Sequence, residues 1–243
     1  MDKYIMELEG IFTTHRVCRS HGIEHAQQVQ KNAQCALEHY DISEHDKFLV
    51  EMASLLHDAD DQKFFPENNN YNNLRKVMQD CPEKDVATVI RMVELVSSSK
   101  NGDSIPDDID DKLWMLVPRY ADRLEAIGET GIERCYRYTK TAGRPLYCTD
   151  TPFPLTKEDI WKHATLERYQ SYKKSNSMID HYYDKLLRLG LFPISNPFFD
   201  KMCEEKQQPL INFLLEMGKI YHTTGQITDT NVEKFLDKLK SEQ

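Results

Sequence analysis

Four side chains of this sequence have the types and positions expected of ligands for a divalent metal ion. His25 lies in SHGIEHAQQV, His57 and Asp58 lie in LLHDADDQKF, and Asp122 lies in YADRLEAIG. Imidazole and carboxylate groups together suit Mn, Fe, Ni, Co, Zn or Mg. Neighbouring helix residues point about 100° apart, so His57 and Asp58 reach one ion only near a helix end. Asp122 lies in an otherwise apolar segment, where an acid needs a partner such as a metal ion.

The elements that must position these side chains are predicted to be helices. In residues 22–40 apolar side chains recur every four positions in line with His25, at Val29, Ala33 and Leu37. The segment from Ser43 to Asp46 predicts a capping box that opens the next helix, and His57 follows Ala53 on its apolar stripe. A single buried histidine is more often a hydrogen-bonded core residue than a ligand. The joint pattern H…HD…D therefore carries the prediction of a metal site.

The rest of the sequence predicts an all-α protein, because alternating strand patterns are nearly absent. Further helices are expected at about 71–80, 84–97, 108–127, 156–173, 176–189, 199–222 and 230–241. Pro118 either interrupts or begins the helix that contains Asp122. Loops are predicted at 68–73, 97–106 and 142–154, the last with room for a short hairpin.

Composition limits the classes of function. The chain has 243 residues, of which 40% are apolar and 29% charged, as in a globular protein. Its net charge of −9 argues against nonspecific binding to DNA or to an anionic membrane, although a local basic pocket can still bind a small anion. The six cysteines form no CxxC motif, and we expect reduced thiols. Without an export signal or an apolar run of membrane-spanning length, we expect a cytoplasmic protein.

The pattern H…HD…D resembles the signature of the HD-domain metal-dependent phosphohydrolases. LLHDADDQKF is similar to the HD-x-x-D-x-K-F motif of one branch, the small bacterial-type nucleoside triphosphate pyrophosphohydrolases. SHGIEHAQQV resembles the helix of that branch that carries the first metal ligand. Later motifs of the branch resemble four further segments of this sequence: SSSKNG (97–102), ADRLEAIGETGIER (121–134), GRPLY (143–147) and SMIDHYYDKLLRL (177–189). The resemblance implies a compact HD-domain helical bundle with a C-terminal helical extension. It describes residues 1–243 as one domain, with a core at about 20–190 and C-terminal helices at about 191–243.

The resemblance also implies roles for individual residues. The metal ligands match His25, His57, Asp58 and Asp122. One divalent ion is expected, because no further histidines occupy the extra-ligand positions of dinuclear HD oxygenases. Asp61 matches an acid just beyond the HD pair, and Lys63 matches a nearby lysine. The branch usually has a second acid two residues before the last ligand. Tyr120 stands there in this sequence, which leaves open any role of that acid in substrate choice.

The chemistry of these groups suits phosphate hydrolysis. A divalent ion lowers the pKa of bound water and polarises a phosphoryl oxygen. Asp61 is the candidate general base, with a solvated acidic cluster as its alternative. Lys63, Lys100 and Arg123 are candidates to neutralise phosphates. For Arg123 the alternative is a structural ion pair with Glu94 or Glu125.

The resemblance therefore predicts an enzyme that hydrolyses phosphate ester or anhydride bonds in nucleotides. It suggests a nucleoside or deoxynucleoside triphosphate as substrate, cut to the monophosphate and pyrophosphate. A nucleotide phosphomonoesterase is the nearest alternative, and a non-catalytic nucleotide-binding HD domain is the second. The expected partner is a small nucleotide, neither a polymeric nucleic acid nor a membrane. Arg144, His181 and Lys185 resemble family positions that have no assigned role.

Overall fold

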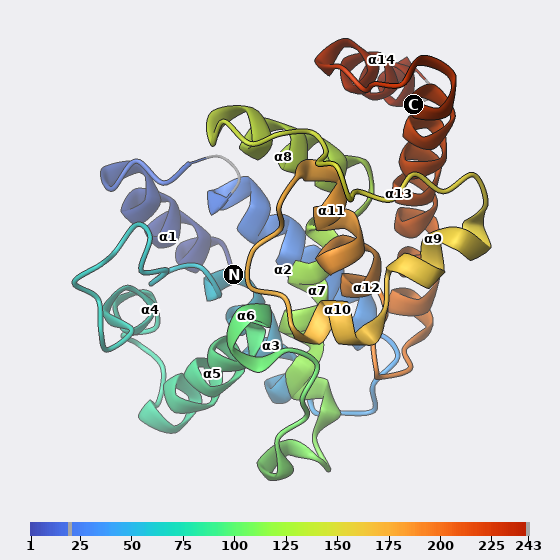
Figure 1. Cartoon of the computed structure of the whole chain (residues 1–243). Coiled ribbons are helices and arrows are strands. Elements are labelled where there is room, and N and C mark those ends of the chain that lie inside the picture. The colour runs from blue at the N-terminus through green and yellow to red at the C-terminus, as the bar shows by residue number, and fades with distance from the viewer. Residues whose placement is uncertain (19–20, 242–243) are drawn as a thin grey trace. The chain divides into compact units, whose positions relative to one another are not determined.

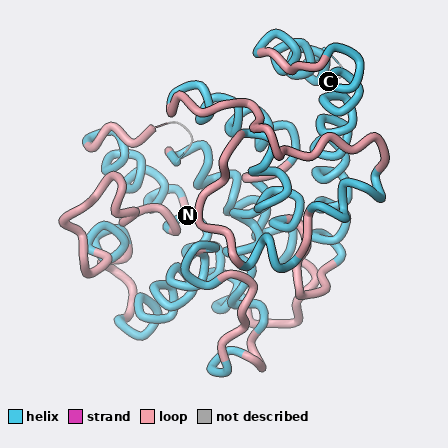
Figure 2. Tube along the Cα trace, in the orientation of Figure 1, coloured by secondary structure: helices cyan, strands magenta, loops and turns pink. Residues whose placement is uncertain are grey.

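The computed structural model describes residues 1–18 and 21–241, and every regular element in them is a helix (Figures 1 and 2). The all-α prediction is therefore confirmed; Ser20, at the start of SHGIEHAQQV, lies outside the described residues. The chain divides into two compact units, one of Met1–Glu125 with Pro193–Asp200 and one of Ala126–Phe192 with Lys201–Gln243. The description of residues 1–243 as one domain stays a prediction.

The first unit is built around helix α2, which packs against α3 and α7. Helices α3 and α7 also pack against α5, while α1 packs against α2 and α4. The elements of this unit are α1 (Asp2–Thr14), α2 (Ile23–Leu37), α3 (Glu44–Leu56), α4 (Asn72–Val77), α5 (Glu83–Val96), α6 (Ser98–Asn101), η2 (Asp107–Ile109), η3 (Leu113–Leu116) and α7 (Val117–Glu125).

The core of the first unit follows from the apolar stripes that the sequence predicted. On α2 the side chains of Val29 and Ala33 are fully buried, and on α3 Ala53 is fully buried. Ser43 caps α3, because its hydroxyl oxygen accepts a hydrogen bond from the Asp46 backbone N–H at 3.1 Å. Pro118 is the second residue of α7, so it begins this helix rather than interrupting it.

The second unit packs α11 and α14 against α8, and α10 against the π-helical segment η4. Its elements are α8 (Gly128–Thr141), α9 (Lys157–His163), α10 (Leu166–Gln170), α11 (Met178–His181), η4 (Tyr182–Leu186), α12 (Leu187–Leu189), α13 (Pro197–Thr224) from Lys201 onward and α14 (Asp229–Ser241). A partly buried ion pair joins two of these elements, because the Arg168 guanidinium of α10 contacts the Asp180 carboxylate of α11 at 2.9 Å.

Several predicted boundaries were wrong. Helix α1 was not predicted, although Tyr4, Leu8, Ile11 and Phe12 bury a helical stripe. Helix α8 was not predicted either. A Cβ atom on Gly131 would lie 2.5 Å from the Ala126 carbonyl oxygen, so this glycine permits a close approach of the backbone.

Other segments differ in detail. The predicted helix 156–173 is divided into α9 and α10. The predicted loop 97–106 contains the short helix α6, and residues 142–154 contain no strand of a hairpin. All six cysteines are free thiols, as expected. Within the described helices, none combines the length and the apolar character needed to cross a membrane.

Candidate metal centre and its cavity

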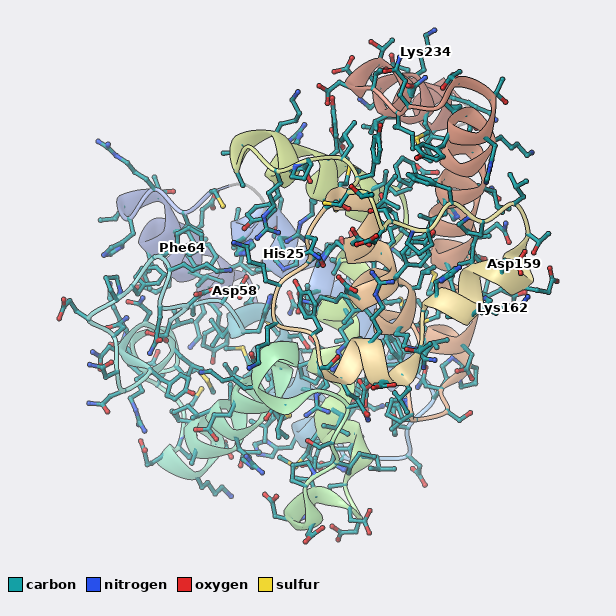
Figure 3. All side chains as sticks on the ribbon, viewed as in Figure 1. His25, Asp58, Phe64, Asp159, Lys162 and Lys234 are labelled. Carbon is teal, nitrogen blue, oxygen red and sulfur yellow. The ribbon has the colours of Figure 1, made fainter. Side chains whose placement is uncertain are left out.

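Three helices of the first unit bring the predicted metal ligands together. His25 is the third residue of α2, His57 is the C-cap of α3 with Asp58 directly after it, and Asp122 lies in α7. Because α2 packs against both α3 and α7, the side chains meet at one point. Figure 3 shows His25 of α2 and Asp58, which follows the end of α3, near one another. The helix end after α3 lets consecutive residues reach the same point, as the sequence predicted.

The four side chains present their nitrogen and oxygen atoms to a common centre. His25 Nε2 lies 3.2 Å from His57 Nε2 and 3.3 Å from Asp122 Oδ1. His57 Nε2 lies 3.4 Å from Asp58 Oδ2 and 3.7 Å from Asp122 Oδ1. The remaining measured separation, from His25 Nε2 to Asp58 Oδ2, is 3.9 Å.

These separations fit one shared metal ion. With metal–ligand bonds of about 2.1 Å, ligand atoms lie about 3.0 Å apart at neighbouring octahedral positions, about 3.4 Å apart in a tetrahedron and about 4.2 Å apart at opposite octahedral positions. Of the six separations among the four side chains, the five given above fall inside that range. Among the described residues, His25, His57 and Asp58 form the single group of three or more His, Cys, Asp and Glu side chains that could hold a metal ion. Asp122 is close to both histidines but is not part of that group.

The ring of His57 is oriented by its own helix. Its Nδ1 lies 2.8 Å from the Ser54 carbonyl oxygen. Because a carbonyl oxygen only accepts, Nδ1 carries a proton and donates it, which directs Nε2 toward the other ligands. This ring is almost fully buried, with 2% of its side chain exposed.

The electrostatics of the cluster favour a positive charge at its centre. Burial of His57 opposes protonation, but the Asp58 carboxylate, with Asp122 and the Ser54 carbonyl, outweighs it and raises the pKa of His57 to about 10. Burial would likewise raise the pKa of both carboxyl groups. The imidazoles of His57 and His25 outweigh burial and hold the pKa of Asp58 and of Asp122 below its usual value. Either a proton or a metal ion can supply the charge that these carboxylates attract.

A cavity of about 390 Å³ adjoins the cluster and brings most of the predicted site residues together. It is lined by His57, Asp58 and Asp122 together with Asp60, Asp61, Gln62, Lys63, Asn68, Asn69, Tyr71, Val93, Glu94, Val96, Ser97 and Lys100. The candidate base Asp61 and the two candidate lysines thus share one cavity with three of the four candidate ligands. Small-molecule sites commonly have volumes of about 300–1,000 Å³.

Asp61 and Lys63 are linked to one another beside the cluster. The Lys63 backbone N–H donates to Asp61 Oδ1 at 2.9 Å, and Lys63 Nζ lies 3.9 Å from Asp61 Oδ2. The Asp61 side chain is 24% exposed and that of Lys63 is 70% exposed. The carboxylate is therefore held in place, while the ammonium group can move to meet a ligand. The roles of both residues stay predictions.

Arg123 occupies a different environment from the two lysines. Its guanidinium donates to Asp103 Oδ1 at 2.6 Å and to the Gly102 carbonyl, and 2% of the side chain is exposed. Its partner is Asp103, where the sequence suggested Glu94 or Glu125. Arg123 is not one of the described residues that line the cavity. These contacts indicate that Arg123 holds the loop at residues 102–103 in position. A contact between Arg123 and the substrate stays a prediction.

The residue that departs from the family pattern, Tyr120, is fully buried. Its ring packs edge-on against Phe199 with centroids 6.1 Å apart, and the Arg123 guanidinium lies 5.4 Å from its centroid. Burial raises the pKa of the Tyr120 hydroxyl, so the phenol is neutral. At this position the chain therefore has a packed aromatic ring where the branch usually has a charged side chain.

Sequence reasoning missed three residues that shape the site. Asp60 was part of the quoted motif but received no role. Its carboxylate accepts hydrogen bonds from the backbone N–H groups of Asn73 and Leu74, both at 2.9 Å. Tyr71 lines the cavity from the loop that this contact fixes. Asn32 joins α2 to α7 through its amide, which donates to the Ala121 carbonyl at 3.3 Å. A polar residue buried on the face of His25 was the available signal for Asn32.

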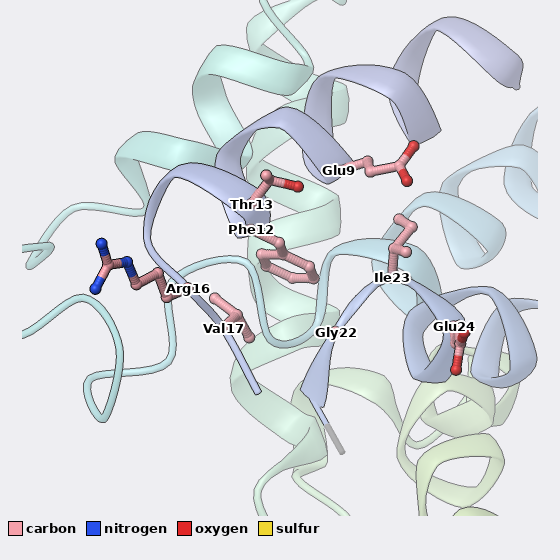
Figure 4. Close-up of a pocket in the computed structure, with 8 residues that line it drawn as sticks. All are labelled: Glu9, Phe12, Thr13, Arg16, Val17, Gly22, Ile23 and Glu24. Atoms are coloured by element: carbon pink, nitrogen blue, oxygen red, sulfur yellow. The ribbon is translucent and has the colours of Figure 1, made fainter. Parts of the chain in front are cut away.

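A second cavity of about 290 Å³ lies where α1 ends and α2 begins (Figure 4). Its lining combines apolar side chains such as Phe12 and Val17 with Glu9, Glu24 and Arg16. None of its lining residues belongs to the group that could hold a metal ion. The chemistry predicted from the sequence is therefore concentrated in the larger cavity.

Comparison with solved structures identifies the fold. An HD-superfamily hydrolase from Bacillus thuringiensis matches 92% of this chain and 96% of its own, with 20% sequence identity and a TM-score of 0.61. YpgQ from Bacillus subtilis, in complex with ADP, matches 87% of this chain and 96% of its own, with 21% identity and a TM-score of 0.55. The chain has the fold of the small bacterial HD-superfamily hydrolases, as the sequence predicted.

The sequence comparison adds a family relationship. The chain is 36% identical over 231 residues to the uncharacterized protein L803 of Acanthamoeba polyphaga mimivirus, covering 86% of this chain and 93% of the viral protein. No protein-family model matches the chain. The chain belongs to one family with this viral protein.

Proposed function

We propose that the protein is a metal-dependent phosphohydrolase that acts on nucleotides, converting a nucleoside or deoxynucleoside triphosphate to its monophosphate and pyrophosphate. One observation carries the proposal. The nitrogen and oxygen atoms of His25, His57 and Asp58 lie at separations that fit a single metal ion, and Asp122 Oδ1 lies 3.3 Å from His25 Nε2. This cluster adjoins a cavity that contains Asp61, Lys63 and Lys100. The fold of HD-superfamily hydrolases and the complex of the fold neighbour YpgQ with ADP support a nucleotide ligand.

The four ligands would hold a divalent ion that polarises a phosphoryl oxygen and makes a water molecule more acidic. The chain's own groups supply the rest of the chemistry. The Asp61 carboxylate, held by the Lys63 N–H, accepts a proton from the water that attacks the α-phosphorus. The water oxygen bonds to the α-phosphorus as the α–β anhydride bond breaks, and pyrophosphate leaves. Lys63 and Lys100 neutralise the charge of the departing phosphates.

Arg123 has an indirect part in this proposal. Arg123 directly follows Asp122 in the sequence, and its guanidinium donates hydrogen bonds to Asp103 and to the Gly102 carbonyl. This contact holds the end of α7 against the loop after α6. Asp122 is thereby kept at the centre of the cluster rather than being drawn into an ion pair with its neighbour.

The experiment is a panel of ribonucleoside and deoxyribonucleoside tri-, di- and monophosphates, each assayed with Mn, Co, Ni and Mg. The products are separated by chromatography. Monophosphate and pyrophosphate from a triphosphate would support the proposal. Release of orthophosphate from monophosphates would instead identify a phosphomonoesterase. Absence of any hydrolysis with every metal, while metal and nucleotide still bind, would identify a non-catalytic nucleotide-binding domain.

A further inference from the structure

Tyr71 is a feature of the larger cavity that the proposed hydrolysis does not use. Among the described lining residues it is the one aromatic side chain besides the imidazole of His57. Val93 and Val96 of α5 line the same cavity. The cavity thus combines a charged part, formed by the candidate ligands and lysines, with apolar groups that bind no phosphate.

The backbone of Tyr71 has a conformation that a tyrosine rarely adopts. Its φ is 55° and its ψ is 44°, in the left-handed region. Asparagine tolerates this region better than most residues that have a side chain. Residues 68–70 and 72–73 are all asparagine, yet the left-handed position is occupied by the tyrosine between them. The backbone conformation therefore does not account for a tyrosine at this position, and a role of its aromatic ring would account for it.

The loop that carries Tyr71 is fixed to the segment after the HD pair. The Asp60 carboxylate accepts hydrogen bonds from Asn68 Nδ2 at 2.6 Å and from the backbone N–H groups of Asn73 and Leu74. Asn73 Nδ2 also donates to the Ala59 carbonyl at 2.7 Å. Since Ala59 and Asp60 directly follow Asp58, the position of the loop is set relative to the candidate metal ligands.

The hydroxyl of Tyr71 is uncharged. Burial, with the carboxylates of Glu94 and Asp60 nearby, raises the pKa of the Tyr71 hydroxyl, so the phenol is neutral. The ring is half-buried, which leaves part of it accessible from the cavity. A neutral, partly accessible aromatic ring on a loop held by hydrogen bonds has the properties of a stacking surface.

We propose that Tyr71 stacks on the nucleobase of a nucleotide whose phosphates occupy the metal cluster and the lysines; this inference rests on the proposed function for the class of ligand. Every nucleobase has a π face, so stacking is tolerant of base identity. Tyr71 therefore distinguishes nucleotides from bare polyphosphates rather than one base from another. Tyr71 thereby forms the part of the cavity that contacts the nucleoside.

The test separates the ring from the backbone through Tyr71→Asn. Asparagine suits the left-handed conformation, so this variant removes the ring while relieving the backbone. Binding is measured by calorimetry in the presence of Mn, with an α,β-methylene nucleoside triphosphate and with inorganic tripolyphosphate as ligands. The dissociation constant of the nucleotide analogue should rise about tenfold to a hundredfold, which corresponds to one lost base–aromatic stack. The dissociation constant of tripolyphosphate should change by less than about threefold, and Tm should not fall.

Two further variants serve as controls. Tyr71→Phe keeps the ring and removes the hydroxyl, and it should bind the nucleotide analogue within about threefold of the wild type. Tyr138→Asn makes the same substitution at a tyrosine of α8 that is 58% exposed, and it should leave both dissociation constants unchanged.

The outcomes distinguish this inference from the proposed function. Equal weakening of nucleotide and tripolyphosphate binding in Tyr71→Asn, or a lower Tm, would assign Tyr71 a structural role and overturn the inference. A wild-type protein that hydrolyses nucleotides, with Tyr71→Asn unchanged in binding, would also overturn the inference while the proposed function stands. Ring-dependent nucleotide binding without hydrolysis by any metal form would support the inference and overturn the proposed function. No binding of the nucleotide analogue to the wild type would overturn the inference.

Discussion

Each of the two units contains a pair of aspartates that contact nitrogen-bearing side chains, and the two pairs have different partners. In the second unit, Asp180 and Asp184 both contact the guanidinium of Arg168. In the first unit, Asp58 and Asp122 contact the imidazoles of His25 and His57 at 3.3 to 3.9 Å. They make no ion pair with a lysine or arginine in the part of the chain that the structure describes.

The difference lies in the chemistry of the cations. A guanidinium is always charged in a protein and has no lone pair to donate to a metal ion, so the Arg168 cluster takes its positive charge from the chain itself. A neutral imidazole can bind a metal ion, so the His25–His57 cluster can accept its positive charge from solution. Arg123 could have closed the first cluster, because it adjoins Asp122. It is directed to Asp103 instead.

Two histidines illustrate the same contrast. The carboxylates of the first unit outweigh burial and raise the pKa of His57 to about 10. In the second unit, burial together with the cations of Lys185 and Arg144 lowers the pKa of His181 to about 4. The sign of the local charge therefore decides which histidine attracts a cation. His57 lies in a negative environment and His181 in a positive one.

The largest expected effect follows from removing a carboxylate of the first cluster. In Asp58→Ala the centre loses one of four oxygen or nitrogen ligands and half of its negative charge. We expect bound metal to fall to background in elemental analysis and nearly all hydrolysis to be lost. The matched control is Asp159→Ala in α9, an aspartate whose carboxylate pairs with Lys162 at 2.6 Å (Figure 3). Full metal content in Asp58→Ala would show that Asp58 is not a metal ligand and would contradict the contrast between the two clusters.

A smaller effect is expected where charge is removed beside the cluster but not from it. Asp61→Asn keeps the oxygen that accepts from the Lys63 N–H, so the local structure and the bound metal should be retained. An amide cannot accept the proton of water, and loss of a general base typically costs about 10²–10⁴-fold in turnover. Metal content and initial rates are measured on the same preparation. Retained turnover would exclude Asp61 as the base, and loss of metal would make it a ligand.

Removing the cation of the second cluster should lower the free energy of unfolding and leave metal binding unchanged. Arg168→Ala leaves Asp180 and Asp184 with only 10% and 13% of their side chains exposed and without their cation. Breaking such a pair should cost about 3 kcal/mol in the free energy of unfolding, the lower end of the range for buried pairs, because Arg168 is 29% exposed. Urea unfolding measures this change.

The control for Arg168 is Arg137→Ala, which removes a pair with Glu133 from an arginine that is 73% exposed. Its free energy of unfolding should change by less than about 1 kcal/mol. Metal content should match the wild type in both variants. A loss of metal in Arg168→Ala would mean that the two clusters are coupled.

The sequence was sufficient to predict which side chains come together in the first cluster, because its members follow local rules; their role as metal ligands stays a prediction. His25 and His57 continue helical apolar stripes, and Asp122 is an acid in an apolar segment, so each position is visible within a few residues. The cavity wall could not be predicted in this way. The loop at Tyr71 depends on hydrogen bonds that the Asp60 carboxylate accepts from residues eight to fourteen positions later. The partner of Arg123 lies twenty residues earlier in a loop, and its place depends on how α5 and α7 pack.

The smallest expected effect concerns a cation that is not buried. Lys63 lines the cavity and is 70% exposed, and its Nζ lies 3.9 Å from Asp61 Oδ2. Lys63→Ala removes one phosphate-neutralising charge and retains the backbone N–H that holds Asp61. We expect kcat/KM to fall about tenfold with metal content unchanged, since one charge-assisted hydrogen bond in a partly solvated site contributes roughly 1.5 kcal/mol.

The control for Lys63 is Lys162→Ala in α9, because that lysine is 72% exposed and also pairs with an aspartate. Its kcat/KM should equal that of the wild type. The salt dependence sharpens the test, because screening weakens the contribution of an exposed charge. The ratio of wild-type to Lys63→Ala kcat/KM should therefore shrink as ionic strength rises. A ratio of one at low salt on every active substrate would remove Lys63 from the site and leave Lys100 as the exposed lysine of the described lining residues.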